Sequence, residues 1–126
     1  NSGGVRIGTA ELYRVVENIN NVMECVAVEQ KYNNDTIILL FVKLKDSIQL
    51  DNNFIKNIKD KIKSNLSPKH IPAKIINVLD IPKTKSGKIV ELTIKKIVNN
   101  EKINNLNSIA NPECLEEFRK KSQITN

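Results

Sequence analysis

A run of seven residues, Pro82-Lys-Thr-Lys-Ser-Gly-Lys88, carries the side chains of this chain that are best suited to act on an anion. It holds three ammonium groups and two hydroxyls. Pro82 fixes its own φ, and Ser86-Gly87 predicts a tight turn because glycine adopts positive φ at little steric cost. Lys88 then precedes the apolar pair Ile89-Val90, so its stem is held while its charge projects from a hairpin loop. Such a loop can deliver a mobile point charge to an anion.

The same pattern has a plainer interpretation, because loops lie on the surface and surfaces are often rich in lysine. A hairpin could carry Lys83, Lys85 and Lys88 for that reason alone and bind nothing. The spacing of these residues does not decide between a basic surface loop and a functional lysine.

No other stretch has the spacing of a familiar catalytic or metal site. His70 is the only histidine and has no base partner near it in sequence, so we interpret it as a structural loop residue. A Gly-rich phosphate-binding loop is absent, and no cluster has metal-ligand spacing. Cys25 and Cys114 lie far apart and have no paired cysteine neighbours, which excludes a C-x-x-C redox or zinc pattern and favours a reducing cytosol. Cys25 stands in an apolar predicted strand, which predicts a small buried side chain.

The basic loop has a partner motif upstream. Residues 82–89 read Pro-Lys-Thr-Lys-Ser-Gly-Lys-Ile, and residues 4–11 read Gly-Val-Arg-Ile-Gly-Thr-Ala-Glu. The first resembles the P-K-T-x-S-G-K-I signature of the adenylate-forming acyl-CoA synthetases. The second resembles the G-x-R-I/L-G-x-x-E segment that opens their small C-terminal domain. The interval between the motifs also fits, and residues 88–95 and 110–115 are similar to the acetoacetyl-CoA synthetase branch of this family.

The resemblance implies that residues 1–126 are the mobile C-terminal domain of a larger cytoplasmic ligase, because the chain starts inside a family motif. Such an enzyme joins a carboxylic acid to AMP, releasing pyrophosphate from ATP, and then transfers the acyl group to CoA. The branch implies acetoacetate, or another short acyl acid, as the substrate. The implied partner is the enzyme's own N-terminal adenylation domain, which would hold Mg²⁺, and neither nucleic acid nor a membrane is implied. Without that domain the chain is expected to be inactive.

By resemblance, Lys88 is the catalytic lysine of adenylation. In that step a carboxylate approaches the α-phosphate of ATP while both are anionic, so a cation between them acts on the developing charge. At about 4 Å and an effective dielectric constant near 20, one such contact is worth roughly 4 kcal/mol. Lysine suits this role as a compact charge on a flexible stem.

Four further residues are implied on the CoA side of the domain, and none is implied for a metal. Gly4 and Gly8 would border the thin thiol arm of CoA, where a Cβ has no room, although both also fit turns at strand ends. Arg6 is the candidate partner of substrate or cofactor anions. Lys63 stands where relatives carry an arginine that contacts the nucleotide phosphates of CoA. Lysine keeps that charge but lacks the bidentate fork.

A basic nucleic-acid-binding module is the alternative that the charge leaves open. The formal net charge is +6, but lysine and asparagine are spread along the whole chain, which weakens that indication. Such a module needs aromatic side chains stacked on a sheet or a G-x-x-G clamp. The chain has two tyrosines and three phenylalanines, mostly in apolar patterns, and no G-x-x-G.

The apolar spacing predicts one α+β domain: a small three-stranded, mostly antiparallel sheet flanked by helices, with a short extended segment at 5–7 and a hairpin loop around Gly87. The uninterrupted apolar run of residues 37–42 predicts a strand buried on both faces, and therefore helices on both sides of the sheet. Helices are predicted from residues 9, 51 and 90, and a last one has Asn111 as its cap and Pro112 at its first position. Strands are predicted at 22–30, 36–44 and 73–81.

Overall fold

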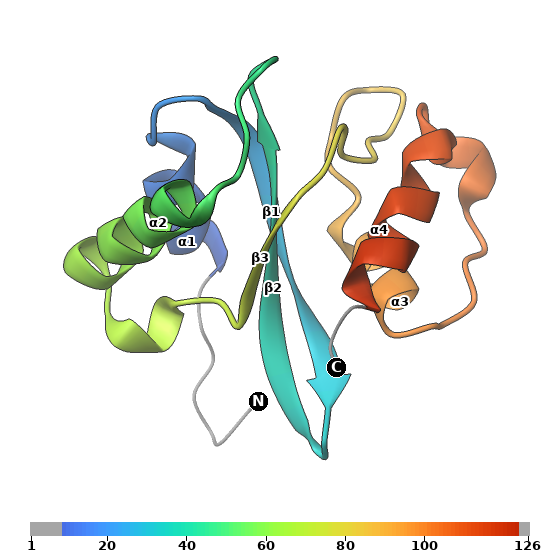
Figure 1. Cartoon of the computed structure of the whole chain (residues 1–126). Coiled ribbons are helices and arrows are strands. Elements are labelled where there is room, and N and C mark those ends of the chain that lie inside the picture. Colours follow the sequence, from blue (N-terminus) through green and yellow to red (C-terminus); the bar gives the residue numbers. More distant parts are fainter. Residues whose placement is uncertain (1–8, 124–126) are drawn as a thin grey trace.

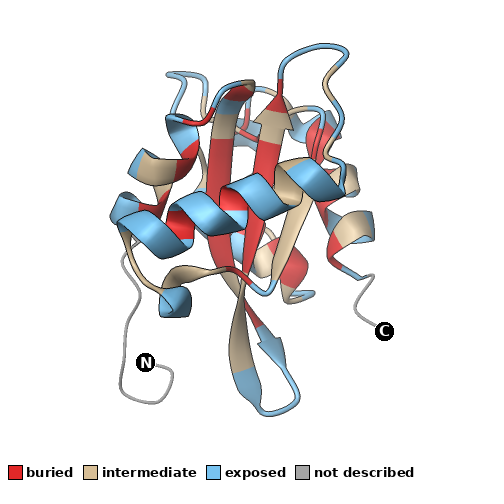
Figure 2. Ribbon diagram, turned by 60° about the vertical axis from the view of Figure 1, so that its left-hand side comes forward, coloured by how far each residue is buried: buried red, intermediate tan, exposed pale blue. Residues whose placement is uncertain are grey.

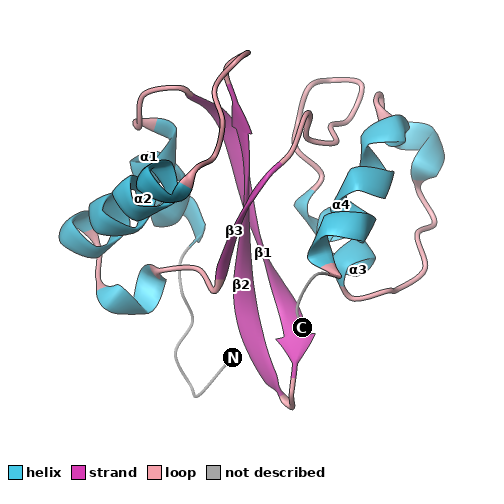
Figure 3. Ribbon diagram, viewed as in Figure 1, coloured by secondary structure: helices cyan, strands magenta, loops and turns pink. Residues whose placement is uncertain are grey.

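A central three-stranded sheet separates two pairs of helices in the computed structural model, which describes residues 9–123 (Figure 1). Helices α1 (Thr9–Glu17) and α2 (Asn52–Asn65) cover one face. Helices α3 (Glu91–Val98) and α4 (Leu115–Ser122) cover the other, and Figure 3 shows the same layers by secondary structure. The predicted α+β fold is confirmed. The predicted extended segment at 5–7 lies outside the described residues.

Strands β1 (Val22–Tyr32) and β2 (Asp35–Leu44) form a long antiparallel hairpin. The two residues that connect them, Asn33 and Asn34, have φ of 51° and 64°. Two consecutive positive φ angles are typical of the type I′ turn, whose twist matches that of the flanking strands. The turn predicted at this point is confirmed, and Figure 2 shows its exposed tip extending from the body of the domain.

Strand β3 (Lys74–Asn77) runs parallel to β2, with Leu39 opposite Lys74 and Val42 opposite Asn77. Parallel neighbours need a long crossover, and α2 supplies it by carrying the chain across one face of the sheet. Asp51 caps this helix as predicted, since its side chain accepts a hydrogen bond from the Phe54 N–H at 2.8 Å. The sheet is therefore mixed, with a long antiparallel pair and a short parallel one.

The third strand is shorter than the predicted span of residues 73–81. The Val78 N–H still donates to the Val42 carbonyl at 2.9 Å. The next N–H, that of Leu79, donates instead to the Glu117 Oε1 of α4 at 2.8 Å. A helix side chain thus takes over the role of the neighbouring strand, and the chain leaves the sheet toward the basic loop.

Alternate side chains of β2 point to opposite faces of the sheet and contribute to a core on each face. Leu39 and Phe41 point toward α3 and α4, whereas Leu40 and Val42 point toward α1 and α2. All four side chains are fully buried. The prediction that the apolar run 37–42 is covered by helices on both sides is confirmed, and Figure 2 shows these strands as the buried centre of the molecule.

Both cysteines are free, buried thiols, and Cys25 belongs to the core that α1 and α2 cover. Burial is the main reason why the pKa of Cys25 rises to about 12, and carboxylates of Glu17 and Glu24 add to it. Burial likewise raises the pKa of Cys114 to about 11. Since the thiolate is the reactive form, both side chains act as small apolar groups at neutral pH, as predicted for Cys25.

Candidate functional site

The basic loop is a small hairpin between β3 and α3, and residues 82–90 are called the signature loop from here on (Figure 1). Lys83 and Ile89 form an isolated antiparallel bridge. Inside it, the Thr84 N–H donates to the Lys88 carbonyl at 2.8 Å and the Gly87 N–H to the Thr84 carbonyl at 2.9 Å. Gly87 has φ of +93°, which confirms the predicted turn. A Cβ at Gly87 would meet nothing within 4 Å, so the backbone angle alone explains the glycine.

Lys88 is held by its backbone and free at its charged end. Its N–H donates to the Thr84 Oγ1 at 3.1 Å, and the same oxygen lies 2.9 Å from the Ser86 Oγ. The following pair, Ile89 and Val90, packs against the core under α3. The Lys88 side chain is exposed, and within residues 9–123 its ammonium has no hydrogen-bond or ion-pair partner. The Lys88 ammonium is thus an exposed point charge at the end of a turn that hydrogen bonds hold in place.

The three lysines of the loop are not equivalent. Lys85 is exposed and, like Lys88, pairs with no described residue. The Lys83 Nζ instead lies 2.6 Å from the Glu24 Oε2 of β1. The Lys43 Nζ of β2 lies 3.2 Å from the Asp80 Oδ1 and 3.9 Å from Glu24. These two acids and two lysines, called the loop-base cluster here, balance each other's charge.

The Asp80 carboxyl illustrates how the loop-base cluster is held. Its partial burial raises its pKa, but hydrogen bonds from Asn111 and from the Ile81 N–H, together with Lys43, outweigh burial and lower the pKa below its ordinary value. Partly exposed ion pairs of this kind contribute little to stability. Their effect is geometric, because they hold the loop to the sheet and leave the charges of Lys85 and Lys88 uncompensated.

Asn111 corrects one sequence prediction. It does precede a helical turn, η4 (Pro112–Cys114), but its side chain makes no capping hydrogen bond. Its Oδ1 accepts from the Lys83 N–H at 2.9 Å. Its Nδ2 donates to the Asp80 Oδ2 at 2.9 Å and to the Ile81 carbonyl at 3.0 Å. The amide is used by the signature loop, and α4 begins only at Leu115.

The far side of the signature loop is fastened through Tyr13 of α1. Its hydroxyl accepts from the Ala27 N–H at 3.1 Å and lies within hydrogen-bond reach of Glu91, the first residue of α3. Burial is the largest cause of the strong rise in the pKa of Tyr13, and the bond to Glu91 adds to it. The tyrosine stays neutral and joins the edge of β1 to the start of the helix that follows Lys88.

The structure brings only some of the predicted site residues together. Gly4, Arg6 and Gly8 lie outside the described residues. Lys63 is exposed in the last turn of α2, on the opposite face of the sheet from the helix that follows Lys88 (Figure 1). His70 lies in η2 (Pro68–His70), with its Nδ1 2.7 Å from the Ser67 Oγ and its Nε2 4.0 Å from the Glu11 Oε1.

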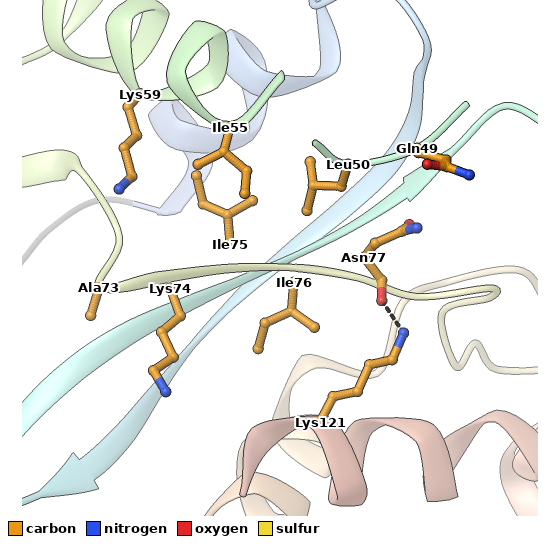
Figure 4. A pocket seen from close by; sticks show the side chains of 10 residues that line it. All are labelled: Gln49, Leu50, Ile55, Lys59, Ala73, Lys74, Ile75, Ile76, Asn77 and Lys121. Atoms are coloured by element: carbon orange, nitrogen blue, oxygen red, sulfur yellow. Dashed lines mark hydrogen bonds between the residues drawn. The ribbon is translucent and has the colours of Figure 1, made fainter. Parts of the chain in front are cut away.

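A groove of about 550 Å³ runs along the open edge of β3 (Figure 4). Of the predicted site residues that the structure describes, neither Lys63 nor Lys88 lines it. The Lys121 Nζ reaches across it to donate to the Asn77 carbonyl at 2.6 Å, and it lies 2.9 Å from Glu117. This lysine is therefore already engaged. The residues that line the groove are Gln49, Leu50, Ile55, Lys59, Ala73, Lys74, Ile75, Ile76, Asn77 and Lys121.

The described part of the chain lacks the features of a metal site, a membrane span or a base-stacking surface. No three acidic, histidine or cysteine side chains between residues 9 and 123 gather as metal ligands would. None of the helices in that range is long and apolar enough to cross a membrane. Helices cover both faces of the sheet, and Phe41 and Phe118 pack against each other in the core, so these rings are not open to stacked bases.

Comparisons with known proteins agree with the family resemblance that the motif of the signature loop indicates. The sequence profile of the AMP-binding enzyme C-terminal domain matches residues 14–88. An acetoacetyl-coenzyme A synthetase of Rhizobium meliloti (strain 1021) is 47% identical over 118 residues, covering 94% of this chain and 18% of the relative. The structure of an acetoacetyl-CoA synthetase from Streptomyces lividans matches with a TM-score of 0.81 and 31% identity, over 94% of this chain and 18% of that one. A Brucella canis acyl-CoA synthetase matches with a TM-score of 0.69 and 27% identity, over 75% of this chain and 18% of its own.

The chain thus spans about 18% of the length of the relatives it matches. The comparisons give no support to the nucleic-acid-binding alternative. The profile match covers more than half of the chain and ends at Lys88, the exposed lysine of the signature loop. The chain belongs to the family of AMP-binding enzyme C-terminal domains.

Proposed function

We propose that this chain is the mobile C-terminal domain of a larger ATP-dependent ligase that converts acetoacetate and CoA to acetoacetyl-CoA, with AMP and pyrophosphate as the other products. The observation that carries the proposal is the Lys88 ammonium, which is exposed and unpaired among the described residues at the end of a hydrogen-bonded hairpin. The names of the relatives support the choice of acetoacetate. The direct test is the half-reaction assay of Lys88→Ala described in the Discussion.

In the proposed adenylation step, a carboxylate oxygen of acetoacetate attacks the α-phosphorus of ATP. A new bond forms between that oxygen and phosphorus, and the bond to pyrophosphate breaks. The Lys88 ammonium would lie against the two approaching anionic groups and lower the cost of bringing them together. The hairpin supplies this ammonium without a competing carboxylate, because the acids near the loop, Asp80 and Glu24, are paired with Lys43 and Lys83.

In the second step the thiol of CoA attacks the acyl-adenylate and AMP leaves. We propose that the domain turns between the steps, so that Lys88 withdraws and the segment from Gly4 to Gly8, with Arg6 and Lys63, faces CoA. Lys63 lies on the opposite face of the sheet from α3, which fits an arrangement in which Lys88 faces the adenylation partners in one step and Lys63 faces the nucleotide end of CoA in the other (Figure 1). Gly4, Arg6 and Gly8 enter this proposal from the family motif.

Two further assignments complete the proposal. Mg²⁺ bound with ATP would be held by the adenylation domain outside this chain, which is also the chain's main partner. The location would be the cytoplasm, and the two free, buried cysteines support a reducing compartment.

The 126-residue chain by itself should fold but show no ligase activity. The two cores on either side of the sheet provide the folding free energy. The proposed chemistry, however, needs acyl and nucleotide pockets that the partner domain would supply. Circular dichroism should show a cooperative melt, and an assay of AMP release from ATP, acetoacetate and CoA should show none. Measurable AMP release by the purified chain would contradict the proposal.

Replacing Gly4 with leucine in the full-length enzyme should separate the two half-reactions. If this segment borders the thiol arm of CoA, a larger side chain obstructs thioester formation but leaves adenylation nearly intact. We expect the rate of thioester formation from supplied acyl-adenylate to fall about tenfold or more, on the scale of a small misplacement of reacting groups. Equal losses in both half-reactions would point to a structural role for Gly4.

A further inference from the structure

The tail of the domain forms part of the signature loop's support. Thr84 and Ile109 form an antiparallel bridge. The Ala110 N–H donates to the Lys83 carbonyl at 2.9 Å, and the Lys83 N–H donates to the Asn111 Oδ1 at 2.9 Å. Both backbone groups of Lys83 are thus hydrogen-bonded to residues 110 and 111. The chain from residue 109 onward, called the tail here, therefore lies against residues 82–84, the first arm of the loop, like a short extra strand.

The Asn111 amide uses all of its hydrogen-bonding groups on this arm. An amide offers one acceptor oxygen and two donor hydrogens. The oxygen takes the Lys83 N–H, and the nitrogen donates to the Ile81 carbonyl at 3.0 Å and to the Asp80 Oδ2 at 2.9 Å. The bonds to Ile81 and Lys83 lie on either side of the buried Pro82, which has no N–H of its own. One side chain therefore sets the direction in which the chain enters the hairpin.

We infer that Asn111 is a positioning residue for Lys88. The first arm is joined to Lys88 by short bonds: Thr84, which follows Lys83, donates to the Lys88 carbonyl at 2.8 Å and accepts from its N–H through Oγ1 at 3.1 Å. A shift of the arm at Lys83 is passed to Lys88 through these two bonds. The inference rests on the proposed adenylation role of Lys88.

This support comes from outside the part of the chain that the family profile matches, because the match ends at residue 88. The match to the Rhizobium meliloti relative covers 94% of the chain and therefore extends past position 111. The tail therefore lies beyond the residues that the family profile matches, and its bonds reach back to the loop in which that match ends.

The test compares Asn111→Ala with Asn99→Ala in the full-length enzyme. Asn99 is a matched control because its amide also makes three bonds, two of which join distant parts of the chain. It accepts from the Lys31 N–H at 2.8 Å and donates to the carbonyls of Glu29 at 3.0 Å and Lys95 at 2.8 Å. It follows α3 and has no bond to the signature loop. Both variants should lose similar stability in a thermal melt.

Only Asn111→Ala should lose adenylation. We expect its kcat for pyrophosphate exchange to fall about tenfold to a hundredfold, since a misplacement of about 1 Å can cost that much. Its KM values for ATP and acetoacetate should change little, and thioester formation from supplied acyl-adenylate should stay within about threefold, because Lys88 is not needed there. Asn99→Ala should keep both half-reactions within about twofold of wild type.

Three results would overturn the inference. The first is normal pyrophosphate exchange by Asn111→Ala while the separate variant Lys88→Ala is inactive. That result would leave the proposed role of Lys88 intact. The second is an equal loss in Asn99→Ala, which would make the effect one of stability. If Asn111→Ala does not fold, Asn111→Asp decides, since it keeps the shape and the acceptor for Lys83 but replaces the donors with an oxygen facing Asp80. Normal exchange by that variant is the third. Near-normal exchange by Lys88→Ala would instead overturn the proposed function itself.

Discussion

Lys88→Ala in the full-length enzyme should slow adenylation by about three orders of magnitude. One cation–anion contact at about 4 Å in a medium of effective dielectric constant near 20 is worth roughly 4 kcal/mol. Each 1.4 kcal/mol, roughly, changes a rate tenfold. The contact exists only while the carboxylate meets the α-phosphate, so thioester formation from supplied acyl-adenylate should remain within a few-fold of wild type. Pyrophosphate exchange and single-turnover thioesterification measure the two steps separately.

Lys85→Ala is the matched control for this experiment. Lys85 stands on the same hairpin, carries the same charge and is equally exposed and unpaired among the described residues. Its loss should change either half-reaction by less than about threefold, the size of a screened surface charge effect. Lys83 is unsuitable as a control, because its ammonium pairs with Glu24 and its backbone holds Asn111. If Lys85→Ala slows exchange as much as Lys88→Ala, the loop is merely basic and Lys88 is not the catalytic lysine.

Phe118→Ala should destabilise the isolated chain by about 3–5 kcal/mol, the usual cost of truncating a buried phenylalanine. Phe118 of α4 is fully buried, and its ring centroid lies 4.4 Å from that of Phe41 on β2. The substitution removes this ring pair and leaves a cavity between the tail and the sheet. Because small domains are stable by only about 5–15 kcal/mol, the urea midpoint followed by circular dichroism should fall markedly.

Phe54→Ala provides the comparison for Phe118→Ala. Phe54 is only partly buried, at the edge of the core that α2 covers, so its truncation removes less surface from water and leaves no closed cavity. We expect Phe54→Ala to lower the free energy of unfolding by less than half as much as Phe118→Ala does. Equal losses would mean that α4 packs more loosely than its buried ring indicates. A large loss at Phe118 would establish the tail as an integral layer of the domain, which a positioning role for Asn111 requires.

Features set by neighbouring residues could be predicted from the sequence. The cap at Asp51 and the turn at Asn33-Asn34 both follow from local hydrogen bonding and backbone preference. Gly87 reveals its turn because few other residues adopt φ near its +93°. The apolar run of β2 implied helices on both faces, since alternate residues of a strand must each be buried. Lys88 was assigned from a motif, and the structure adds that its ammonium has no partner within residues 9–123.

The direction and length of β3 depended on the tertiary structure. The apolar spacing of residues 73–81 predicts a strand, but it cannot say that α2 returns the chain parallel to β2. Nor can it say that Glu117, from a helix far along the chain, takes the Leu79 N–H and ends the pairing. An acceptor on a distant helix leaves no trace in the local pattern.

The support of the signature loop was equally hidden. Asn111 precedes a proline, which is a strong local indication of a helix cap, yet its amide bonds to Lys83, 28 positions away. Glu24 meets Lys83 across 59 positions, and Tyr13 meets Glu91 across 78. Spacing rules describe residues within one turn or one strand, whereas these pairs exist only after two layers pack on the sheet. The sequence alone therefore identifies the lysine and its turn, and the packed fold decides where they are held.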